Sequence, residues 1–117
     1  MSVALARIVV SVSDLDRSLA FYEGVLGFRT TWRGDAVVRL KSGDLELMLH
    51  QREVEPSQRA IAVSFTVDDV DSATDAAALV GAEIIDPPDD QPWGERQSVL
   101  TDPDGHIVCL VSALPNQ

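Results

Sequence analysis

The chain has 117 residues, of which 45% are hydrophobic, and a formal net charge of -10 from nineteen acidic and nine basic residues. This length and hydrophobic share predict one folded domain with a real core and disfavour a disordered chain. The acidic balance argues against a nucleic-acid partner, because phosphate binding depends on clustered Lys and Arg. An acidic protein instead favours cationic partners through its long-range field.

The cysteine content and the amino terminus bear on the compartment. Cys109 is the single cysteine of the sequence, so no intrachain disulfide forms and a reducing compartment fits best. The first residues lack a basic region followed by a long apolar run and a cleavage site. No apolar stretch reaches the roughly 18 residues that span a bilayer. We therefore expect a cytoplasmic protein with no membrane partner.

One sequence pattern occurs twice. VSVSDLDRS begins at Val10, and a weaker copy, FTVDDVDSA, begins at Phe65, so that Asp14 falls on Asp69. Each copy continues through a helix-like segment to a glycine. Because there are two copies and not many, the repeat predicts a domain with pseudo-twofold halves rather than a solenoid.

The first half follows the order strand, helix, strand, strand, strand. β-Branched residues predict a buried first strand, and Ser13 or Asp14 can cap the helix after it. Apolar residues then recur at helical spacing until Gly24 or Gly27 ends the helix. Gly-Asp and Ser-Gly-Asp separate the next three strands and carry hairpin chemistry. The expected strands are residues 5–12, 28–33, 36–41 and 45–50.

The second half repeats this order after a polar linker. Asp68 or Asp69 can cap an Ala-rich helix that ends near Gly81. The next strand is expected to stop at Pro87 and Pro88, because proline cannot donate to a central ladder. PPDDQPWGE then forms a loop, and TDPDG builds the turn between the last two strands. The expected strands are residues 61–67, 83–86, 96–100 and 106–111.

These elements predict an α+β fold made of two βαβββ modules. Side by side, the modules would form a curved mixed sheet, a half-barrel or cup with helices on its outer face. We expect a single domain over residues 1–117, with module one at about 4–50, a linker at 51–59 and module two at about 60–114.

This organisation, with SDLDRSLAFYEGVLGF and the closing DPDGHIVCLV, resembles the vicinal oxygen chelate superfamily over nearly the whole chain. That superfamily contains glyoxalases, extradiol dioxygenases, fosfomycin resistance enzymes and bleomycin resistance proteins. QPWGER followed by DPDG is most similar to the bleomycin resistance branch, in which a comparable loop borders the drug site. The resemblance implies a homodimer whose clefts take residues from both subunits, and the apolar edges of a half-barrel support that expectation.

The resemblance also implies where a metal would bind. Metal-using members draw ligands from the first and last strands of each module, commonly His or Gln from the first and Glu from the last. Those positions here are Arg7, Glu46, Ala62 and Cys109. Arg7 keeps its charge and would repel a cation, and one thiolate with one distant carboxylate falls short of a zinc site. His50 is the one residue that could assist Glu46.

The ligand positions therefore predict no metal and no other cofactor. Whether the protein is an enzyme stays open, and the pattern leans toward none. Without a metal, Glu46 or His50 would be the general acid or base in the cup. Arg7 and Glu46 belong to the same module, so we predict an ion pair between them where a metal would otherwise sit. The alternative is that strand alternation slips by one residue and the two side chains point apart.

The rest of the predicted concave face carries small or apolar groups with a few hydroxyls, which suits an organic ligand. Trp93 lies in a Pro-rich loop, where it could stack on a planar or cationic ligand or anchor the loop. The acidic residues around it are either a solvated face or an attraction for a cation. Trp32 and Met48 either contact the ligand or fill the cup. The candidate ligand-binding residues are Arg7, Trp32, Glu46, Met48, His50, Ser64, Trp93 and Cys109.

The sequence thus favours a metal-independent small-molecule binding protein of the glyoxalase and bleomycin resistance type, with antibiotic sequestration as one such role. One alternative is a metal-dependent glyoxalase- or dioxygenase-type enzyme, a lyase or oxidoreductase, with an atypical ligand set. Another is a module whose cup has lost its ligand. The expected partner is a small organic molecule, planar or cationic, and its identity does not follow from one sequence.

Overall fold

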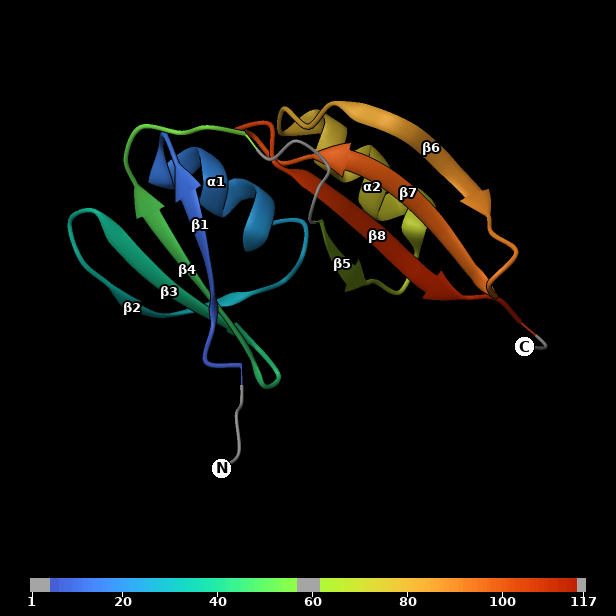
Figure 1. The fold of residues 1–117 in the computed structure, drawn as a ribbon, viewed down its shortest axis with the longest axis horizontal. Helices are drawn as coiled ribbons and strands as arrows, with labels where there is room; N and C mark the ends of the chain where they lie inside the picture. The colour runs from blue at the N-terminus through green and yellow to red at the C-terminus, as the bar shows by residue number, and fades with distance from the viewer. Residues whose placement is uncertain (1–4, 57–61, 116–117) are drawn as a thin grey trace. The chain divides into compact units, whose positions relative to one another are not determined.

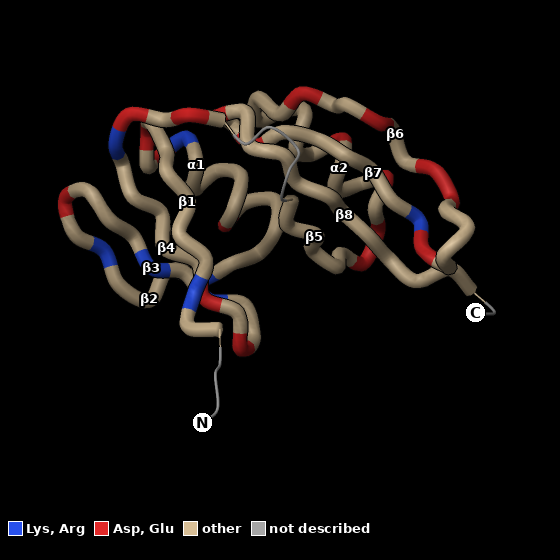
Figure 2. Tube along the Cα trace, in the orientation of Figure 1, with Lys and Arg blue, Asp and Glu red and all other residues tan. Residues whose placement is uncertain are grey.

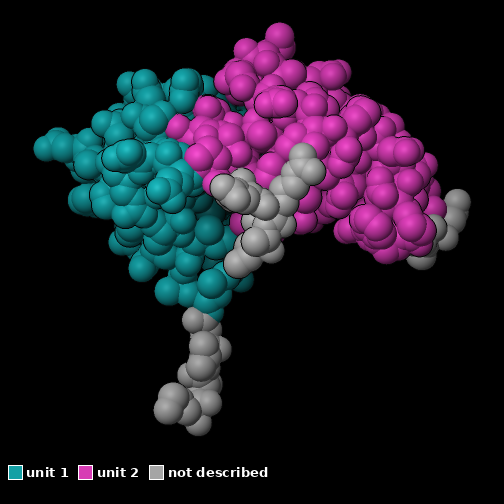
Figure 3. Space-filling model, turned by 45° about the horizontal axis from the view of Figure 1, so that its top comes forward, with its two compact units in different colours: residues 1–55 teal, residues 56–117 magenta. Residues whose placement is uncertain are grey.

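The computed structural model describes residues 5–56 and 62–115. The chain consists of two compact units, residues 1–55 and residues 56–117 (Figure 3). The boundary lies within the segment predicted as a linker. The described residues of each unit form one helix and four strands.

The first unit is built from β1 (Ile8–Val12), α1 (Leu15–Tyr22), β2 (Arg29–Arg33), β3 (Val37–Ser42) and β4 (Leu45–Gln51) (Figure 1). Its sheet has the strand order β1-β4-β3-β2. β1 runs parallel to β4, and the other neighbours are antiparallel. The first strand begins at Ile8 rather than at Leu5, so Arg7 lies just before it.

The second unit is built from β5 (Val63–Thr66), α2 (Val70–Leu79), β6 (Ile84–Asp90), β7 (Glu95–Thr101) and β8 (Ile107–Ala113). Its sheet has the strand order β5-β8-β7-β6, with β5 parallel to β8 and the other neighbours antiparallel. The start predicted for its first strand, Ile61, lies outside the described residues. Both units therefore share one topology and one pattern of strand directions.

The predicted fold class, α+β with two βαβββ modules, is confirmed by this element order. The structure holds two separate four-stranded sheets, neither of them closed. How the two sheets combine stays a prediction, as does dimerisation. None of the described helices is long and apolar enough to cross a membrane. The cytoplasmic location also stays a prediction.

The repeated aspartates begin both helices. Asp14 Oδ1 accepts a hydrogen bond from the backbone N–H of Arg17 at 3.1 Å, and Asp69 Oδ1 accepts one from Ser72 at 3.1 Å. Each aspartate has extended backbone and satisfies an N–H group that the first helical turn leaves without an intrahelical partner. Asp14 and Asp69 are thus the N-caps, and the repeat marks the same structural point in each module.

The second aspartate of each repeat connects its helix to its sheet. Asp16 lies in the first turn of α1 and forms an ion pair with Arg33 of β2 at 3.1 Å. Asp71 takes the same place in α2 and pairs with Arg96 of β7 at 3.1 Å. Both acids also sit where the helix dipole favours negative charge. These pairs establish which face of each sheet the helix covers.

The helix-covered face of the first sheet forms the core of its unit. Apolar side chains from α1 and from alternate strand positions are buried together, as the period of two predicts. Glycine ends the segment after α1, where Gly27 has φ 78°, a conformation that other residues adopt rarely. The buried apolar residues are Val12, Leu15, Leu19, Phe21, Tyr22, Phe28, Val38, Leu40, Leu47 and Leu49.

The predicted end of the β6 strand at Pro87 and Pro88 is wrong. β6 continues through both prolines to Asp90, and the expected loop shortens to the residues before Glu95. Two register shifts interrupt the pairing of β6 with β7. β6 is an edge strand of its sheet, and proline is compatible with an edge because one side of the strand has no neighbouring strand among the described residues.

Candidate functional site

The face of the first sheet that α1 leaves uncovered is its helix-free face. On β2, Arg33 reaches α1 through its ion pair with Asp16, so the preceding Trp32 points to the opposite face. Trp32 lies opposite Arg39 in the β2–β3 register, and Arg39 lies opposite Met48 in the β3–β4 register. Cross-strand partners share a face. The helix-free face therefore carries Trp32, Arg39 and Met48.

At one end of this face, near the start of β4, Glu46 is held between two arginines. Arg7 Nε donates to Glu46 Oε2 at 2.5 Å. Arg39 donates to the other oxygen, Oε1, from Nη2 at 2.6 Å and from Nε at 3.2 Å. The Glu46 side chain is 8% exposed, whereas the arginine side chains are 38% and 42% exposed. The predicted Arg7–Glu46 ion pair is confirmed, and the carboxylate has a second partner that the sequence did not reveal.

The two guanidinium groups determine the charge state of Glu46. The hydrogen bond from Arg7 lowers the pKa of the carboxyl below its ordinary value of 4.5, and the hydrogen bond from Arg39 lowers it further. Burial acts in the opposite direction but does not prevail. Glu46 is therefore ionised at neutral pH, with each oxygen engaged by a permanently charged donor.

The residues at the implied metal-ligand positions do not fit a metal site. Both oxygens of Glu46 already accept charged hydrogen bonds, and a guanidinium beside a carboxylate repels an approaching cation. The Ala62 side chain has no donor atom, and Cys109 is a single thiol. Within residues 5–56 and 62–115, no group of three or more His, Cys, Asp or Glu side chains is placed to hold a metal ion.

His50 does not assist Glu46. The two residues are four positions apart on β4, which separates them by roughly 13 Å along the strand. His50 instead lies opposite Ser11 of β1 and Val37 of β3, toward the other end of the sheet. Met48 lies between His50 and Glu46, opposite Val9 and half-buried. The helix-free face thus has a charged end at Glu46 and a more apolar middle.

Trp32 remains accessible on this face. Its side chain is 53% exposed, so it does not fill a core. The ring lies over Gly34, where an added Cβ would meet a Trp32 ring atom at 2.7 Å. Glycine therefore makes room for the indole at the β2–β3 turn. The prediction that Trp32 contacts a ligand stays a prediction.

The helix-free face of the second sheet has different chemistry. Ser64 of β5 lies opposite Cys109 of β8, and Cys109 lies opposite Val99 of β7. Arg96 is the one basic residue among the described residues of this unit, and its ion pair with Asp71 directs it toward α2. Ser64 and Cys109 are thus brought together, but without a charged partner comparable to Arg7. Their role in ligand binding stays a prediction.

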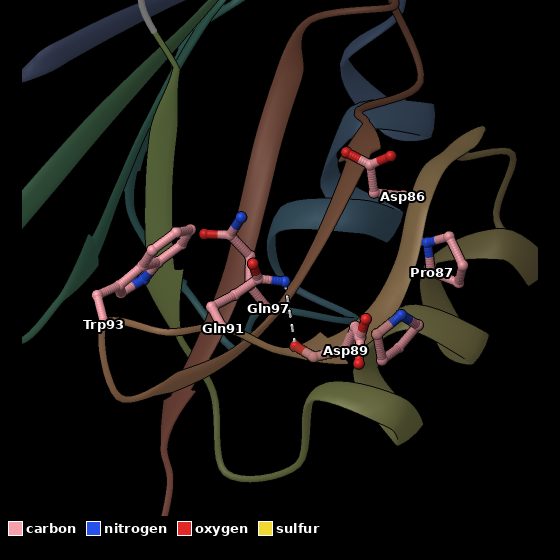
Figure 4. Close-up of a pocket in the computed structure, with 7 residues that line it drawn as sticks. Asp86, Pro87, Asp89, Gln91, Trp93 and Gln97 are labelled. Atoms are coloured by element: carbon pink, nitrogen blue, oxygen red, sulfur yellow. Dashed lines mark hydrogen bonds between the residues drawn. The ribbon is translucent and has the colours of Figure 1, made fainter. Parts of the chain in front are cut away.

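Trp93 borders a hollow of about 530 Å³ in the second unit. The Trp93 side chain is 60% exposed and donates from Nε1 to Glu95 Oε1 at 3.0 Å. In Figure 4 the indole ring points toward Gln97, and Gln91 Nε2 donates to the Asp89 backbone oxygen at 3.4 Å. An exposed aromatic ring beside carboxylates can stack on a planar cation. The lining residues are Asp86, Pro87, Pro88, Asp89, Gln91, Trp93 and Gln97.

Arg39 is the functional candidate that sequence reasoning missed. The ligand positions that the family resemblance implies predicted Arg7 and Glu46 on one face, because the repeat fixed where the first strand begins. No sequence repeat fixed the β3–β4 register. In that register Arg39 lies opposite Met48, which is two residues from Glu46 on the same face of β4, so Arg39 comes close to Glu46. The hairpin turn Ser42-Gly43-Asp44 was the available signal, because turn length determines which residues pair in a hairpin.

Two open four-stranded sheets, each built from a βαβββ module, define the vicinal oxygen chelate fold, and the family comparison agrees. The family model described as "Glyoxalase/Bleomycin resistance protein/Dioxygenase superfamily" matches residues 4–110. The chain belongs to this superfamily, and the resemblance seen in the sequence is confirmed.

Individual relatives differ in name and length. The chain is 34% identical over 110 residues to "Putative glyoxylase CFP32" of Mycobacterium tuberculosis. The aligned region covers 87% of this chain but 41% of that protein. The chain thus spans about two fifths of the length of CFP32. It is 28% identical over 109 residues to "Metallothiol transferase FosB" of Lysinibacillus sphaericus, covering 88% of this chain and 77% of that protein.

Among solved structures, a glyoxalase/bleomycin resistance protein/dioxygenase family enzyme from Burkholderia phytofirmans matches with a TM-score of 0.82. It is 23% identical, with 93% of this chain and 98% of that chain covered. The fosfomycin resistance protein FosX of Listeria monocytogenes matches with a TM-score of 0.81 at 19% identity, covering 98% and 97%. At these identities the matches establish the fold alone.

Proposed function

We propose that the protein binds a small organic ligand without a metal ion, on the helix-free faces of its modules. One observation carries this proposal: Arg7 and Arg39 together bind both carboxylate oxygens of Glu46. The carboxylate that best suits a metal is neutralised by two fixed cations, so the position serves charge pairing in place of metal binding. Antibiotic sequestration, as in the bleomycin resistance branch, is one form that such binding takes.

The hollow at Trp93 supports a planar or cationic ligand in module two. Trp93 offers an exposed π-face, and Asp86 and Asp89 supply negative charge on the lining of the same hollow. An exposed cation–π contact contributes about 0.5–1 kcal/mol, and neighbouring carboxylates add attraction for the same charge. The net charge of -10 favours cations over the whole chain as well.

Calorimetric titration of the metal-free protein tests this proposal. Bleomycin and N-methylquinolinium are titrated into protein held in EDTA, with Trp93→Ala as the variant. We expect saturable binding in EDTA and a Kd about three-fold or more weaker in Trp93→Ala, since one exposed cation–π contact is removed. Trp32→Ala is the matched control, because it removes the other exposed tryptophan from the other unit and is expected to leave this Kd unchanged.

Three results would contradict the proposal. Binding that disappears in EDTA and returns with added Zn²⁺ or Mn²⁺ would show that a metal holds the ligand. Equal Kd values for wild type and Trp93→Ala would show that the hollow takes no part. Flat titrations with both ligands would favour a module whose face has lost its ligand.

The alternative function is a metal-dependent enzyme of the glyoxalase or dioxygenase type with an atypical ligand set. Its support is the names of two relatives, a glyoxylase and a metallothiol transferase. No described cluster of ligand side chains favours it. Recovery of activity on a 2-oxoaldehyde–thiol adduct or a catechol after metal loading would establish this alternative in place of metal-independent binding.

We further propose that the protein is a cytoplasmic homodimer. Among the strands of the described residues, the edge strands β1 and β2 of one sheet, and β5 and β6 of the other, each have one side without a neighbouring strand. Unpaired edges of this kind are usually protected, and pairing with a second copy is one protection. Light scattering after gel filtration measures the mass in solution, and the mass of a single chain at micromolar concentration would contradict the dimer.

A further inference from the structure

The helix-free face of the first sheet is positively charged in an otherwise acidic protein. Its register places Arg29 opposite Lys41 and Lys41 opposite Glu46, so all three share the face with Arg39. Arg7 joins them through its bond to Glu46. Four of the nine basic residues of the chain thus lie on one face of one sheet, and Glu46 is the one carboxylate on that face among the described strand residues.

The rest of the molecule makes this concentration of cations distinctive. The chain carries nineteen acidic residues, and Figure 2 shows the acidic positions distributed along both units. On the helix-covered side of the first sheet, Arg33 is paired with Asp16, so it adds no uncompensated charge. An anion approaching this protein is therefore repelled over most of the surface and attracted at the helix-free face of the first sheet.

Hydrogen-bond donors remain available on this face. Arg7 uses Nε toward Glu46, and Arg39 uses Nε and Nη2. A guanidinium has five N–H donors, so Nη1 and Nη2 of Arg7 and Nη1 of Arg39 still have donors to offer. The described residues provide no ion pair for Arg29 or Lys41. Glu46 thus orients two arginines and leaves the face with more positive than negative charge.

An apolar surface adjoins these donors. Trp32 lies next to Arg39 across β2 and β3 and is 53% exposed. Val9, 49% exposed, lies opposite Met48 on the same face. A flat aromatic surface beside guanidinium groups suits a ligand that combines a negative group with an apolar or aromatic body. The guanidinium groups can bond the negative group, and the indole can pack against the apolar body.

We propose that the helix-free face of the first sheet binds an aromatic carboxylate, with Arg7, Arg39 and Lys41 facing the carboxylate and Trp32 facing the ring. The inference rests on the proposed function in placing a ligand on this face, and adds the sign of its charge. It assigns opposite ligand charges to the two modules, since the Trp93 hollow in module two is acidic. A carboxylate suits Arg39 in particular, because planar guanidinium donors match its geometry.

Two-dimensional NMR of the ¹⁵N-labelled protein, held in EDTA, tests the inference. The chain contains two tryptophans, so two indole N–H signals report separately on the two modules, and Trp93→Phe identifies which is which. Benzoate is expected to shift the Trp32 indole signal and the β3 and β4 amide signals in a saturable way. Benzylammonium, of the same shape and opposite charge, is expected to leave those signals in place.

Variants then assign the contribution of each cation. Lys41→Gln removes an exposed charge that has no ion pair among the described residues, and is expected to weaken benzoate binding about three-fold. Arg39→Gln is expected to weaken it about ten-fold or more, because charge-assisted hydrogen bonds are lost. Arg33→Gln is the matched control: it removes the same charge from the opposite face of the same sheet and is expected to change the Kd less than two-fold.

Each outcome separates this inference from the proposed function. Benzylammonium shifting the Trp32 signal as strongly as benzoate, no shift with benzoate, or equal losses in Lys41→Gln and Arg33→Gln would overturn the anion site. None of these results would bear on metal independence. Benzoate binding that requires added metal would instead overturn the proposed function, because the carboxylate would then be held by the ion and not by the arginines.

Discussion

The two modules have the same fold and matching strand registers, but their helix-free faces differ completely in charge. Lys41 lies opposite Glu46 in the first sheet, and the corresponding pair in the second sheet is Val99 and Cys109. Arg39, opposite Met48, corresponds in the same way to Gln97, opposite Val111. The first face carries a network of ionic groups with four cations. At the matching positions the second face carries uncharged side chains, and its charges are the carboxylates Asp86 and Asp89 of β6, which lie opposite Val99 and Gln97.

The fold constrains one face of each sheet far more than the other. The helix-covered faces must pack closely, so they retain buried side chains such as Leu47 and Leu110 at equivalent places. The helix-free faces have no such packing partner within their own unit. Their residues can change chemistry without loss of the fold, which is why the functional difference between the modules resides there.

The largest expected effect concerns the helix-covered face, at two equivalent positions. Leu40 of β3 is fully buried, and its counterpart Ser98 of β7 shares a 2.7 Å hydrogen bond with Thr74 of α2. Leu40→Ala is expected to lower the free energy of unfolding by about 2–5 kcal/mol, since it opens a cavity. Ser98→Ala is expected to cost about 1 kcal/mol, because Thr74 keeps its bond to the Val70 carbonyl at 2.6 Å.

Urea unfolding measures both values. Equal losses would show that the two helix–sheet contacts are alike in spite of their different chemistry. The double variant Ser98→Ala/Thr74→Val serves as a control. Its total loss of unfolding free energy should be little more than that of Thr74→Val alone, because both changes remove the same shared hydrogen bond.

A smaller effect is expected from the helix-free faces. Glu46→Gln leaves Arg7 and Arg39 beside a neutral amide and is expected to lower the melting temperature. The equivalent change in module two, Cys109→Ser, is expected to alter the free energy of unfolding by no more than about 0.5 kcal/mol, since Cys109 is half-exposed. Differential scanning calorimetry of the two variants at pH 7 measures this contrast, and equal melting temperatures would contradict it.

The Glu46 contribution also predicts a dependence on pH. Because the folded state lowers the pKa of Glu46 below its ordinary value of 4.5, this contribution is present above that value and is lost as the pH falls through the lower, folded pKa. The melting temperatures of wild type and Glu46→Gln should therefore differ at neutral pH and converge in acid. Curves that stay parallel down to pH 2 would show that the carboxylate charge does not stabilise the fold.

Much of the fold followed from the sequence, for identifiable reasons. The repeat narrowed the N-caps to Ser13 or Asp14 and to Asp68 or Asp69, and the structure selects Asp14 and Asp69. The ligand positions implied by the family resemblance predicted that Arg7 and Glu46 share one face. The course of β6 through two prolines did not follow, because edge position depends on strand order, which local sequence does not encode. Arg39 was missed for a similar reason: its contact depends on the β3–β4 register.

In the two candidate sites, too, the sequence predicted some features and missed those that depend on how the strands pair. The exposure of Trp93 agreed with its Pro-rich loop, but the hollow beside it depends on the paired course of β6 and β7. His50 was the one residue that could assist Glu46. A strand extends about 3.3 Å per residue, so the four positions between them place the imidazole too far from the carboxylate. Residue type could be judged from the sequence, whereas distance between side chains could not.

The central claim is that Glu46 is engaged by Arg7 and Arg39 and therefore holds no metal. Equilibrium dialysis against Zn²⁺, Mn²⁺ and Ni²⁺, followed by elemental analysis, tests it directly in wild type and in Arg7→Ala/Arg39→Ala. We expect no stoichiometric metal in wild type and stronger metal uptake in the double variant, in which Glu46 is released. One tightly held ion per chain in wild type, lost in Glu46→Gln, would show that Glu46 is a metal ligand after all.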